Sequence, residues 1–270
     1  MGEAHDHNRR RIEVLEAYEP NIADALARCD GDEARCLMPI CALCARPFRI
    51  QLTEEKLALV AALPGPHRDV TIYLDSIEAG RLPYVDLKRH HEKLRVRLNR
   101  CGFRGSIIVG GTEAGWNARK RVWILHLHAL AIGVPPEAWA ELRRRLKRAP
   151  EPKPVHDAPL RDAARQLSYQ QKFTTFHRPS RTGGGRAVPL PPPRLAELAA
   201  WLANYEFESF MFLFGARRRA GRIFIEARPD LARIDETGTN LRDAPNPPGG
   251  RPESRSGAAR KGRSREKRSN

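Results

Sequence analysis

The sequence predicts an α+β fold in which a central antiparallel sheet is flanked by helices, with a small N-terminal zinc-binding segment and a disordered, basic C-terminal tail. Segments rich in β-branched residues alternate with amphipathic helical segments, which is typical of mixed architectures rather than of helical bundles. Four of the five cysteines lie in one stretch, from Cys29 to Cys44. Residues 242–270 hold nine Lys or Arg and three Asp or Glu, a net charge of +6, and almost no large apolar side chains, so they bury too little surface to fold.

The length and charge of the chain limit the kinds of protein it can be. Its 270 residues are enough for one sizeable domain or two small ones, and 48 Lys and Arg against 32 Asp and Glu give a net charge of +16. No apolar run reaches about 18 residues, which excludes a membrane-spanning helix. No apolar stretch follows the charged first residues, which argues against a secretion signal. We therefore expect a cytoplasmic protein whose partner is a polyanion, and nucleic acid is the usual one.

The cysteine-rich stretch has the pattern of a metal site. Cys29, Cys36, Cys41 and Cys44 form a C-x6-C-x4-C-x2-C pattern, in which one turn offers two thiolates to a tetrahedral ion and a neighbouring loop offers the other pair. The alternative, a set of buried or disulfide-bonded cysteines, is less favoured in a chain without a secretion signal. We therefore predict a structural Zn²⁺ site and interpret Cys101 as an ordinary residue at a helix end.

The first half of the chain is expected to contain helices around one strand. Residues 12–28 have helical spacing that Pro20 interrupts. A short helix is predicted over residues 53–63, with Thr as its N-cap and two glutamates in its first turn. The β-branched and aromatic run VTIYLDSI at 70–77 predicts a strand. Apolar residues at steps of three and four predict an amphipathic helix with a basic outer face over 85–99.

The second half is expected to contain a β-hairpin and three helices. The hairpin strands are predicted over residues 105–113 and 122–132, joined by a polar turn. Proline near the first turn and arginines in the last predict a helix over 135–148, and a Pro-rich connection follows. The remaining predicted elements are helices over 160–176 and 194–214 and a short strand over 223–225.

These elements divide the chain into five predicted parts. They are an N-terminal segment with the cysteine site (1–50), a central domain (51–181), a Gly/Pro linker (182–193), a helical accessory region (194–235) and the basic tail (236–270).

A His-x-His pair in the second hairpin strand is the next chemical signal. On a strand, residues two apart face the same side, so His126 and His128 can hold one cation together. The pattern is weak alone, and the pair His5 and His7 in a polar, unstructured terminus is interpreted as chance. His126 and His128 differ because they lie in an apolar strand, where buried imidazoles need partners.

Glu113 is expected to complete this cation site. If the hairpin turns near residues 119–120, Glu113 lies opposite His126, and opposed residues project to one face. Two imidazoles and a carboxylate suit Mg²⁺ or Mn²⁺. Without the histidines opposite, a carboxylate that merely ends a hairpin would be the better interpretation.

The segment after residue 167 carries a candidate nucleophile. On a helix, Lys172 and Phe173 lie three and four positions after Tyr169 and share its face. A lysine beside a phenol favours the phenolate and can also contact phosphate, and activated tyrosines form covalent intermediates. An isolated YxxK pattern more commonly reflects a tyrosine that packs in the core as part of a helix.

Together these motifs resemble the rolling-circle replication initiators of the HUH endonuclease superfamily. The resemblance covers residues 29–176 and rests on the order of the cysteine stretch, the His126-Leu127-His128 strand and the later YxxK segment. Within this superfamily, the chain is similar to the plasmid Rep initiators that use a single tyrosine, because Phe173 stands where other members have a second tyrosine. The strand at 70–77 lacks the threonine-rich ending of the family's first motif.

The resemblance implies a bacterial enzyme that nicks and joins single-stranded DNA at an origin. It implies Tyr169 as nucleophile, Lys172 as its neighbour at the phosphate, and a 5′-phosphotyrosine intermediate, with a host helicase and polymerase as further partners. The expected backbone-gripping residues lie at the hairpin tip and on the helix after it: Arg119, Lys120, Arg121, Arg143, Arg144 and Arg145.

Other interpretations stay open at the level of sequence. Basic runs on a helix are nearly as often a solvated face as a binding surface. Within the same chemistry, the protein could be a transposase or a mobilisation relaxase. The competing class is a noncatalytic, zinc-dependent nucleic-acid-binding regulator, and a ribosome-associated structural protein is less favoured.

Overall fold

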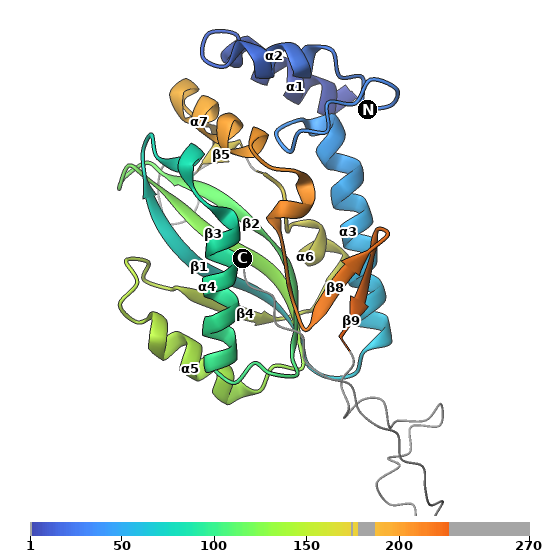
Figure 1. Ribbon diagram of the computed structural model, residues 1–270, viewed down its shortest axis with the longest axis vertical. Coiled ribbons are helices and arrows are strands. Elements are labelled where there is room, and N and C mark those ends of the chain that lie inside the picture. The colour runs from blue at the N-terminus through green and yellow to red at the C-terminus, as the bar shows by residue number, and fades with distance from the viewer. Residues whose placement is uncertain (1, 174, 178–186, 227–270) are drawn as a thin grey trace, which may run out of the picture. The chain divides into compact units, whose positions relative to one another are not determined.

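The computed structural model describes residues 2–173, 175–177 and 187–226, and it has the α+β architecture that the sequence predicts (Figure 1). Five antiparallel strands form the main sheet in the order β4-β1-β3-β2-β7. These strands are β1 (His67–Glu78), β2 (Ile107–Asn117), β3 (Val122–Ile132), β4 (Val155–Pro159) and β7 (Met211–Phe214). Two further hairpins are β5 (Phe176–His177) with β6 (Val188–Pro189), and β8 (Ala216–Arg219) with β9 (Arg222–Ile225).

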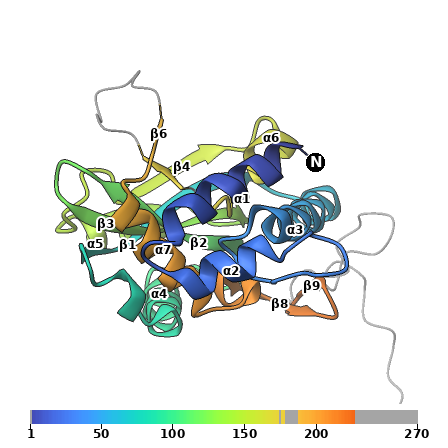
Figure 2. The ribbon, with the colours of Figure 1, turned by 90° about the horizontal axis from the view of Figure 1, so that it is seen from above.

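Helices cover both faces of the sheet and one of its ends. They are α1 (Gly2–Leu15), α2 (Pro20–Ala27), α3 (Ala42–Ala62), α4 (Leu87–Arg100), α5 (Pro136–Leu146), α6 (Ala163–Ser168) and α7 (Pro192–Ala203), with 3₁₀ turns η1 (Leu82–Tyr84) and η2 (Phe207–Phe210). Side chains of α4 and α5 pack on one face and those of α3 and α6 on the other. The helices α1, α2 and α7 lie together at one end (Figures 1 and 2). Within the described residues, none of the helices is both long and apolar enough to cross a membrane.

The alternation of side chains along β3 assigns its histidines to one face. Leu127 and Ala129 point to the core under α4 and α5, whereas Leu130 and Ile132 point to the core under α3 and α6. Because side chains alternate with a period of two, the histidines at 126 and 128 share the face of Leu130. That face is the one covered by α3 and α6.

The pairing predicted between Glu113 and His126 is confirmed. β2 and β3 pair without interruption from Ile107 opposite Ile132 to Asn117 opposite Val122. The first hairpin strand was predicted to end at residue 113, but β2 continues to Asn117 before the turn. The carboxylate thus lies inside the ladder, not at its end.

Two predicted helices end earlier than the sequence spacing indicates. The helix predicted over 160–176 is wrong in extent, because α6 ends at Ser168 and the left-handed φ angles of Gln171 and Phe173 (63° and 43°) cannot continue a helix. The helix predicted over 194–214 is also too long. Residues 211–214 pair with β2 as strand β7, because a run of large apolar side chains suits a sheet edge as well as a helix.

Three segments carry more structure than predicted. The N-terminus with His5 and His7 is helical, as part of α1, although it was expected to be unstructured. The helix predicted over 53–63 is the second half of α3, which begins directly after Cys41. The Pro-rich connection at 149–159 contains β4, which pairs with β1 along the edge of the sheet.

The predicted division into parts is only partly visible in the described residues. Residues up to 226 form one compact unit, and the predicted accessory region contributes β7 to the central sheet. Residues 187–193 of the predicted linker hold β6 and the start of α7, while residues 182–186 lie outside the described residues. The predicted tail at 236–270 also lies outside them.

Candidate functional site

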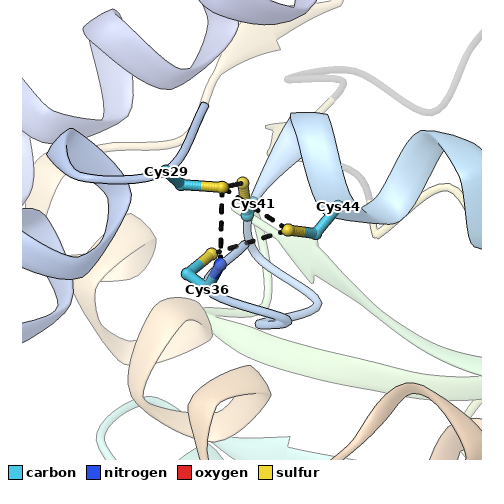
Figure 3. A group of neighbouring side chains, drawn as sticks. All are labelled: Cys29, Cys36, Cys41 and Cys44. Atoms are coloured by element: carbon cyan, nitrogen blue, oxygen red, sulfur yellow. Dashed lines mark hydrogen bonds between the residues drawn. The ribbon is translucent and has the colours of Figure 1, made fainter. Parts of the chain in front are cut away.

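The four cysteines of the N-terminal stretch converge on one point (Figure 3). Cys29 follows α2, Cys36 lies in the loop, Cys41 immediately precedes α3 and Cys44 lies in its first turn. The Sγ–Sγ distances are 3.5 Å between Cys29 and Cys44, 3.8 Å between Cys36 and Cys44, and 3.6 Å between Cys41 and Cys29. A tetrahedral Zn²⁺ with Zn–S bonds of about 2.3 Å requires Sγ–Sγ distances of about 3.8 Å. The cluster therefore could hold such a metal ion, whereas Cys101 lies apart, as predicted, next to the end of α4.

Side chains of α1 support the cysteine cluster from outside. Asn8 donates from Nδ2 to Cys41 Sγ (3.1 Å) and accepts at Oδ1 from the amide of Ala42 (2.8 Å). Arg11 donates to the carbonyl oxygen of Ile40, and burial lowers its pKa to about 10. Hydrogen bonds from the Cys36 thiol and from Asn8 lower the pKa of Cys41 to about 4. A thiolate is thus favoured at Cys41, and outer hydrogen bonds of this kind orient metal ligands.

Glu113, His126 and His128 form a second group of metal-ligand atoms. One ligand atom from each side chain lies within 4.8 Å of the others. Glu113 comes from β2 and the two histidines come from β3, all on the sheet face under α3 and α6. The two imidazole rings meet edge to face, with centroids 4.6 Å apart.

Each imidazole uses Nδ1 for an internal hydrogen bond. His126 Nδ1 is 3.0 Å from the carbonyl oxygen of Ile124, and His128 Nδ1 is 2.9 Å from Thr71 Oγ1 in β1. Because a carbonyl oxygen can only accept, His126 carries its proton on Nδ1 and presents the lone pair of Nε2. Within the described chain neither Nε2 makes a hydrogen bond. A ring anchored at Nδ1 with a free Nε2 is the usual state of a metal-binding histidine.

Burial sets the ionisation of this group. Burial lowers the pKa of His126 and of His128 to about 4, so both rings are neutral at pH 7. Burial raises the pKa of Glu113, although His126 and backbone N–H groups oppose that shift. A buried carboxylate beside two neutral imidazoles could hold a divalent cation, which would offset the cost of burying the negative charge.

The segment after α6 is attached directly to Glu113. The backbone amide of Lys172 donates to Glu113 Oε1 (2.9 Å), and the amide of Gln171 also bonds this carboxylate. The Gln171 side chain is 2% exposed, and within the described residues neither of its amide atoms has a hydrogen-bond partner. The Gln171 side chain lies against Gly111 of β2, which pairs with His128 of β3. A hydrated cation at the site would offer these polar atoms a partner, because Mg²⁺ usually keeps several of its waters.

The sequence did not indicate a buried polar chain that holds this segment in place. Lys56 of α3 is 1% exposed and donates from Nζ to Gln170 Oε1 (2.7 Å), and Gln170 Nε2 donates to Asp69 Oδ1 in β1 (2.9 Å). One available signal was the spacing of Lys56 between the buried Leu52 and Leu59, which places it on the apolar side of the helix.

Tyr169 lies just beyond the end of α6 and is 65% exposed. It shares no helical face with Lys172, contrary to prediction, because the helix has ended. Lys172 instead folds back so that its Nζ lies 3.0 Å from the centre of the Tyr169 ring. Both side chains line a cavity of about 790 Å³. None of the three candidate cation ligands lines that cavity, and the link between cavity and ligands is the backbone of Lys172.

The basic residues predicted to grip DNA differ in their surroundings. Arg119 and Arg121 are exposed at the turn between β2 and β3, beside Lys120, which donates from Nζ to the carbonyl oxygen of Pro150 (2.9 Å). The three arginines of α5 are ion paired. Arg143 pairs with Asp157, and Arg144 and Arg145 both pair with Glu141.

Comparison of the chain with protein-family models, with curated proteins and with solved structures finds no match. The functional proposal therefore depends on the chemistry of the residues described above. They comprise a four-cysteine cluster, a buried Glu-His-His group and an exposed tyrosine with a lysine on its ring.

Proposed function

We propose that the protein is a nicking-joining endonuclease of the HUH type, which cleaves single-stranded DNA at a replication origin through Tyr169. The observation that carries the proposal is the bond between the Tyr169 segment and the candidate cation site. The amides of Gln171 and Lys172 bind Glu113, which pairs with His126 in the sheet. The expected nucleophile and the expected cation ligands are therefore parts of one structural unit.

The residues of this unit suit phosphodiester transfer. Glu113, His126 and His128 would hold Mg²⁺ or Mn²⁺, which supplies polarisation of the scissile phosphate and neutralises developing charge. Tyr169 Oη attacks phosphorus and loses its proton to solvent. The bond from phosphorus to the 3′ oxygen breaks, and the departing oxygen takes up a proton. The products are a 5′-phosphotyrosine link and a free 3′-hydroxyl.

Lys172 and the cysteine cluster have supporting roles in this proposal. The ammonium of Lys172, held over the Tyr169 ring, would contact the phosphate and neutralise its charge. Zn²⁺ at the four cysteines is structural.

Because the protein–DNA link keeps the phosphodiester energy, the same site can rejoin the strand by attack of a 3′-hydroxyl. The free 3′-hydroxyl would prime rolling-circle synthesis with a host helicase and polymerase in the bacterial cytoplasm.

A covalent-adduct assay tests the proposal. Single-stranded oligonucleotides drawn from a candidate origin are incubated with the protein and Mn²⁺, and the adduct is separated on a denaturing gel. Tyr169→Phe should abolish the adduct, and His126→Ala/His128→Ala should lower its yield by at least about 100-fold. Tyr84→Phe is the matched control, because Tyr84 is also exposed (80%) and lies in η1. An adduct that persists in Tyr169→Phe excludes Tyr169 as the nucleophile.

A second candidate is a noncatalytic, zinc-dependent nucleic-acid-binding regulator. The observation that favours it is that α3, which begins directly after Cys41, carries Cys44 together with Arg46 and Arg49, and both arginines line the cavity beside the cluster. Such a protein would lose binding when its zinc is removed and would give no Mg²⁺- or Mn²⁺-dependent strand break at any sequence. A transposase or relaxase of the same chemistry would be distinguished by the DNA ends that it cleaves.

A further inference from the structure

A cavity of about 790 Å³ lies between the N-terminal helices and the Tyr169 segment. One wall is α1 and another is the first half of α3. The third wall is formed by Tyr169, Lys172, Phe173, Thr175, Phe176, His177 and Ala187. The cavity thus brings the helices around the cysteine cluster to the proposed nucleophile.

The cavity is lined by cations that, within the described residues, have no acidic partner. Arg46, Arg49 and Lys172 line it, and none of them forms an ion pair with a carboxylate of the described residues. The one lining carboxylate, Glu3, lies 3.7 Å from His7. The arginines of α5, by contrast, are all ion paired. A polyanion gains the most binding free energy at positive charges without ion-pair partners in a concave site, because it does not have to break an existing ion pair.

Aromatic side chains accompany these cations. Tyr169 and Phe176 line the cavity, and the Phe176 ring meets the His7 ring edge to face with centroids 6.1 Å apart. His177 also lines it, and its buried Nδ1 has no hydrogen-bond partner within the described residues. Cations that follow a phosphate backbone, interleaved with rings on which bases stack, are the usual composition of single-strand binding sites.

We infer that this cavity binds the single strand beside the cleaved phosphate, with Arg46 and Arg49 on its backbone and Tyr169 and Phe176 against its bases. The inference rests on the proposed function and assigns its substrate to a site. Arg46 and Arg49 are one turn apart on α3, so they face the cavity together. Its volume is that of a pocket for a drug-sized molecule, roughly a nucleotide or two. The zinc-binding segment thereby contributes one wall of the substrate site.

Binding of a fluorescent dT12 oligonucleotide to the full chain tests this inference. Fluorescence anisotropy is measured over a range of NaCl concentrations without added divalent cation, so that cleavage does not interfere. Arg46→Ala/Arg49→Ala should weaken binding by at least about tenfold near 0.15 M salt. It should also reduce the slope of log K against log salt by about 1.4, because each lost single-strand phosphate contact removes about 0.7. Arg46→Lys/Arg49→Lys keeps the charge and should retain most of the slope.

The matched control removes two exposed cations from α4, on the opposite face of the sheet. Lys93→Ala/Arg100→Ala should change the affinity by less than about twofold and leave the slope within 0.7 of the parent. Zinc content and thermal unfolding of each variant confirm that the fold is kept. An equal affinity and slope for the cavity variant and the control variant overturns the inference.

Failure of the inference and failure of the proposed function give different results. If the parent forms the Tyr169 adduct while the two double variants bind alike, the nuclease proposal stands and the cavity assignment falls. If no oligonucleotide forms an adduct while only the cavity variant loses dT12 binding, the cavity is a single-strand site and the nuclease proposal falls.

Discussion

Lys56 is a charged residue in a position that an apolar residue would normally occupy. Burial lowers its pKa to about 7, and Glu113 and Asp69 oppose this shift. Its Nζ donates to Gln170, the residue next to Tyr169. A lysine able to lose its proton near neutral pH can keep this hydrogen bond as a neutral amine. The cost of burying its charge therefore depends on pH.

The stability of the protein should rise with pH above neutrality because of Lys56. Between about pH 7 and 10.5 the unfolded state binds the proton and the folded state does not, so unfolding becomes less favourable as the pH rises. The contribution approaches about 1.4 kcal/mol per pH unit within that window. Lys56→Met should remove this rise, measured as urea unfolding from pH 7 to 10.

The exposed Lys93→Met in α4 is the matched control, and it should keep the pH dependence of the parent. Cysteine ionisation contributes equally to all three proteins and therefore cancels in the comparison. Parallel stability curves for Lys56→Met and the parent would contradict a depressed lysine pKa.

At the scale of elements, β2 and the turn after α6 fit together only because β2 carries glycine at position 111. A Cβ at Gly111 would overlap the Gln171 side chain. The close approach lets the amides of Gln171 and Lys172 reach Glu113. Glycine inside a strand commonly marks such an approach of another segment. The strand therefore holds one candidate cation ligand and also contacts the segment that carries Tyr169.

Gly111→Ala should displace the turn and destabilise the protein by about 2 kcal/mol, a usual cost of overpacking. Gln171→Gly should suppress much of this loss, because it removes the overlapping side chain and suits the φ of 63° at that position. Urea unfolding of the two single variants and the double variant measures the coupling. Additive effects would show that the two positions do not touch.

Gly115→Ala in the same strand controls for the general effect of alanine on β2. Its added Cβ would lie 3.4 Å from the nearest atom, His126 Cε1, which is an ordinary contact. We expect a change of less than about 0.5 kcal/mol in the free energy of unfolding.

At the scale of the whole described unit, the cysteine cluster ties the N-terminal helices to the rest of the molecule. Cys29, Cys41 and Cys44 belong to one apolar core that also contains Leu15 of α1 and Trp201 of α7. The same core reaches β3. Metal held by the four cysteines would therefore stabilise a large end of the molecule and the α1–α3 wall of the cavity.

Cys41→Ser should remove the zinc and lower the free energy of unfolding by at least about 3 kcal/mol, because metal binding to such a site is coupled to folding. Metal analysis of the purified protein should find one zinc per parent chain and none in this variant. Cys101→Ser is the matched control, since Cys101 is a buried cysteine outside the cluster. Loss of zinc from Cys101→Ser, or its retention by Cys41→Ser, would contradict the assignment.

Local patterns identified most of the elements and the pairing at the candidate site. The apolar run around His126 predicted a strand because a period of two needs only a few residues to be evident, and the register with Glu113 followed from the position of the turn. Patterns failed at residues 160–176, where the backbone leaves the helix after Ser168 and turns through left-handed φ angles. They also failed at residues 194–214, where apolar residues suit a helix and a strand alike. There the choice depends on distant partners, such as the edge of β2 for residues 211–214.

The sequence by itself determined the α+β class, the cysteine group and the opposition of Glu113 and His126, because each depends on spacing within one short segment or one hairpin. Only the tertiary structure decided that Tyr169 stands outside a helix, that Lys56 is buried beneath Gln170, and that α1 and α3 enclose the space in front of Tyr169. The last two of these features join residues more than 100 positions apart. No local pattern encodes such contacts, because they arise from the packing of elements that are far apart in the sequence.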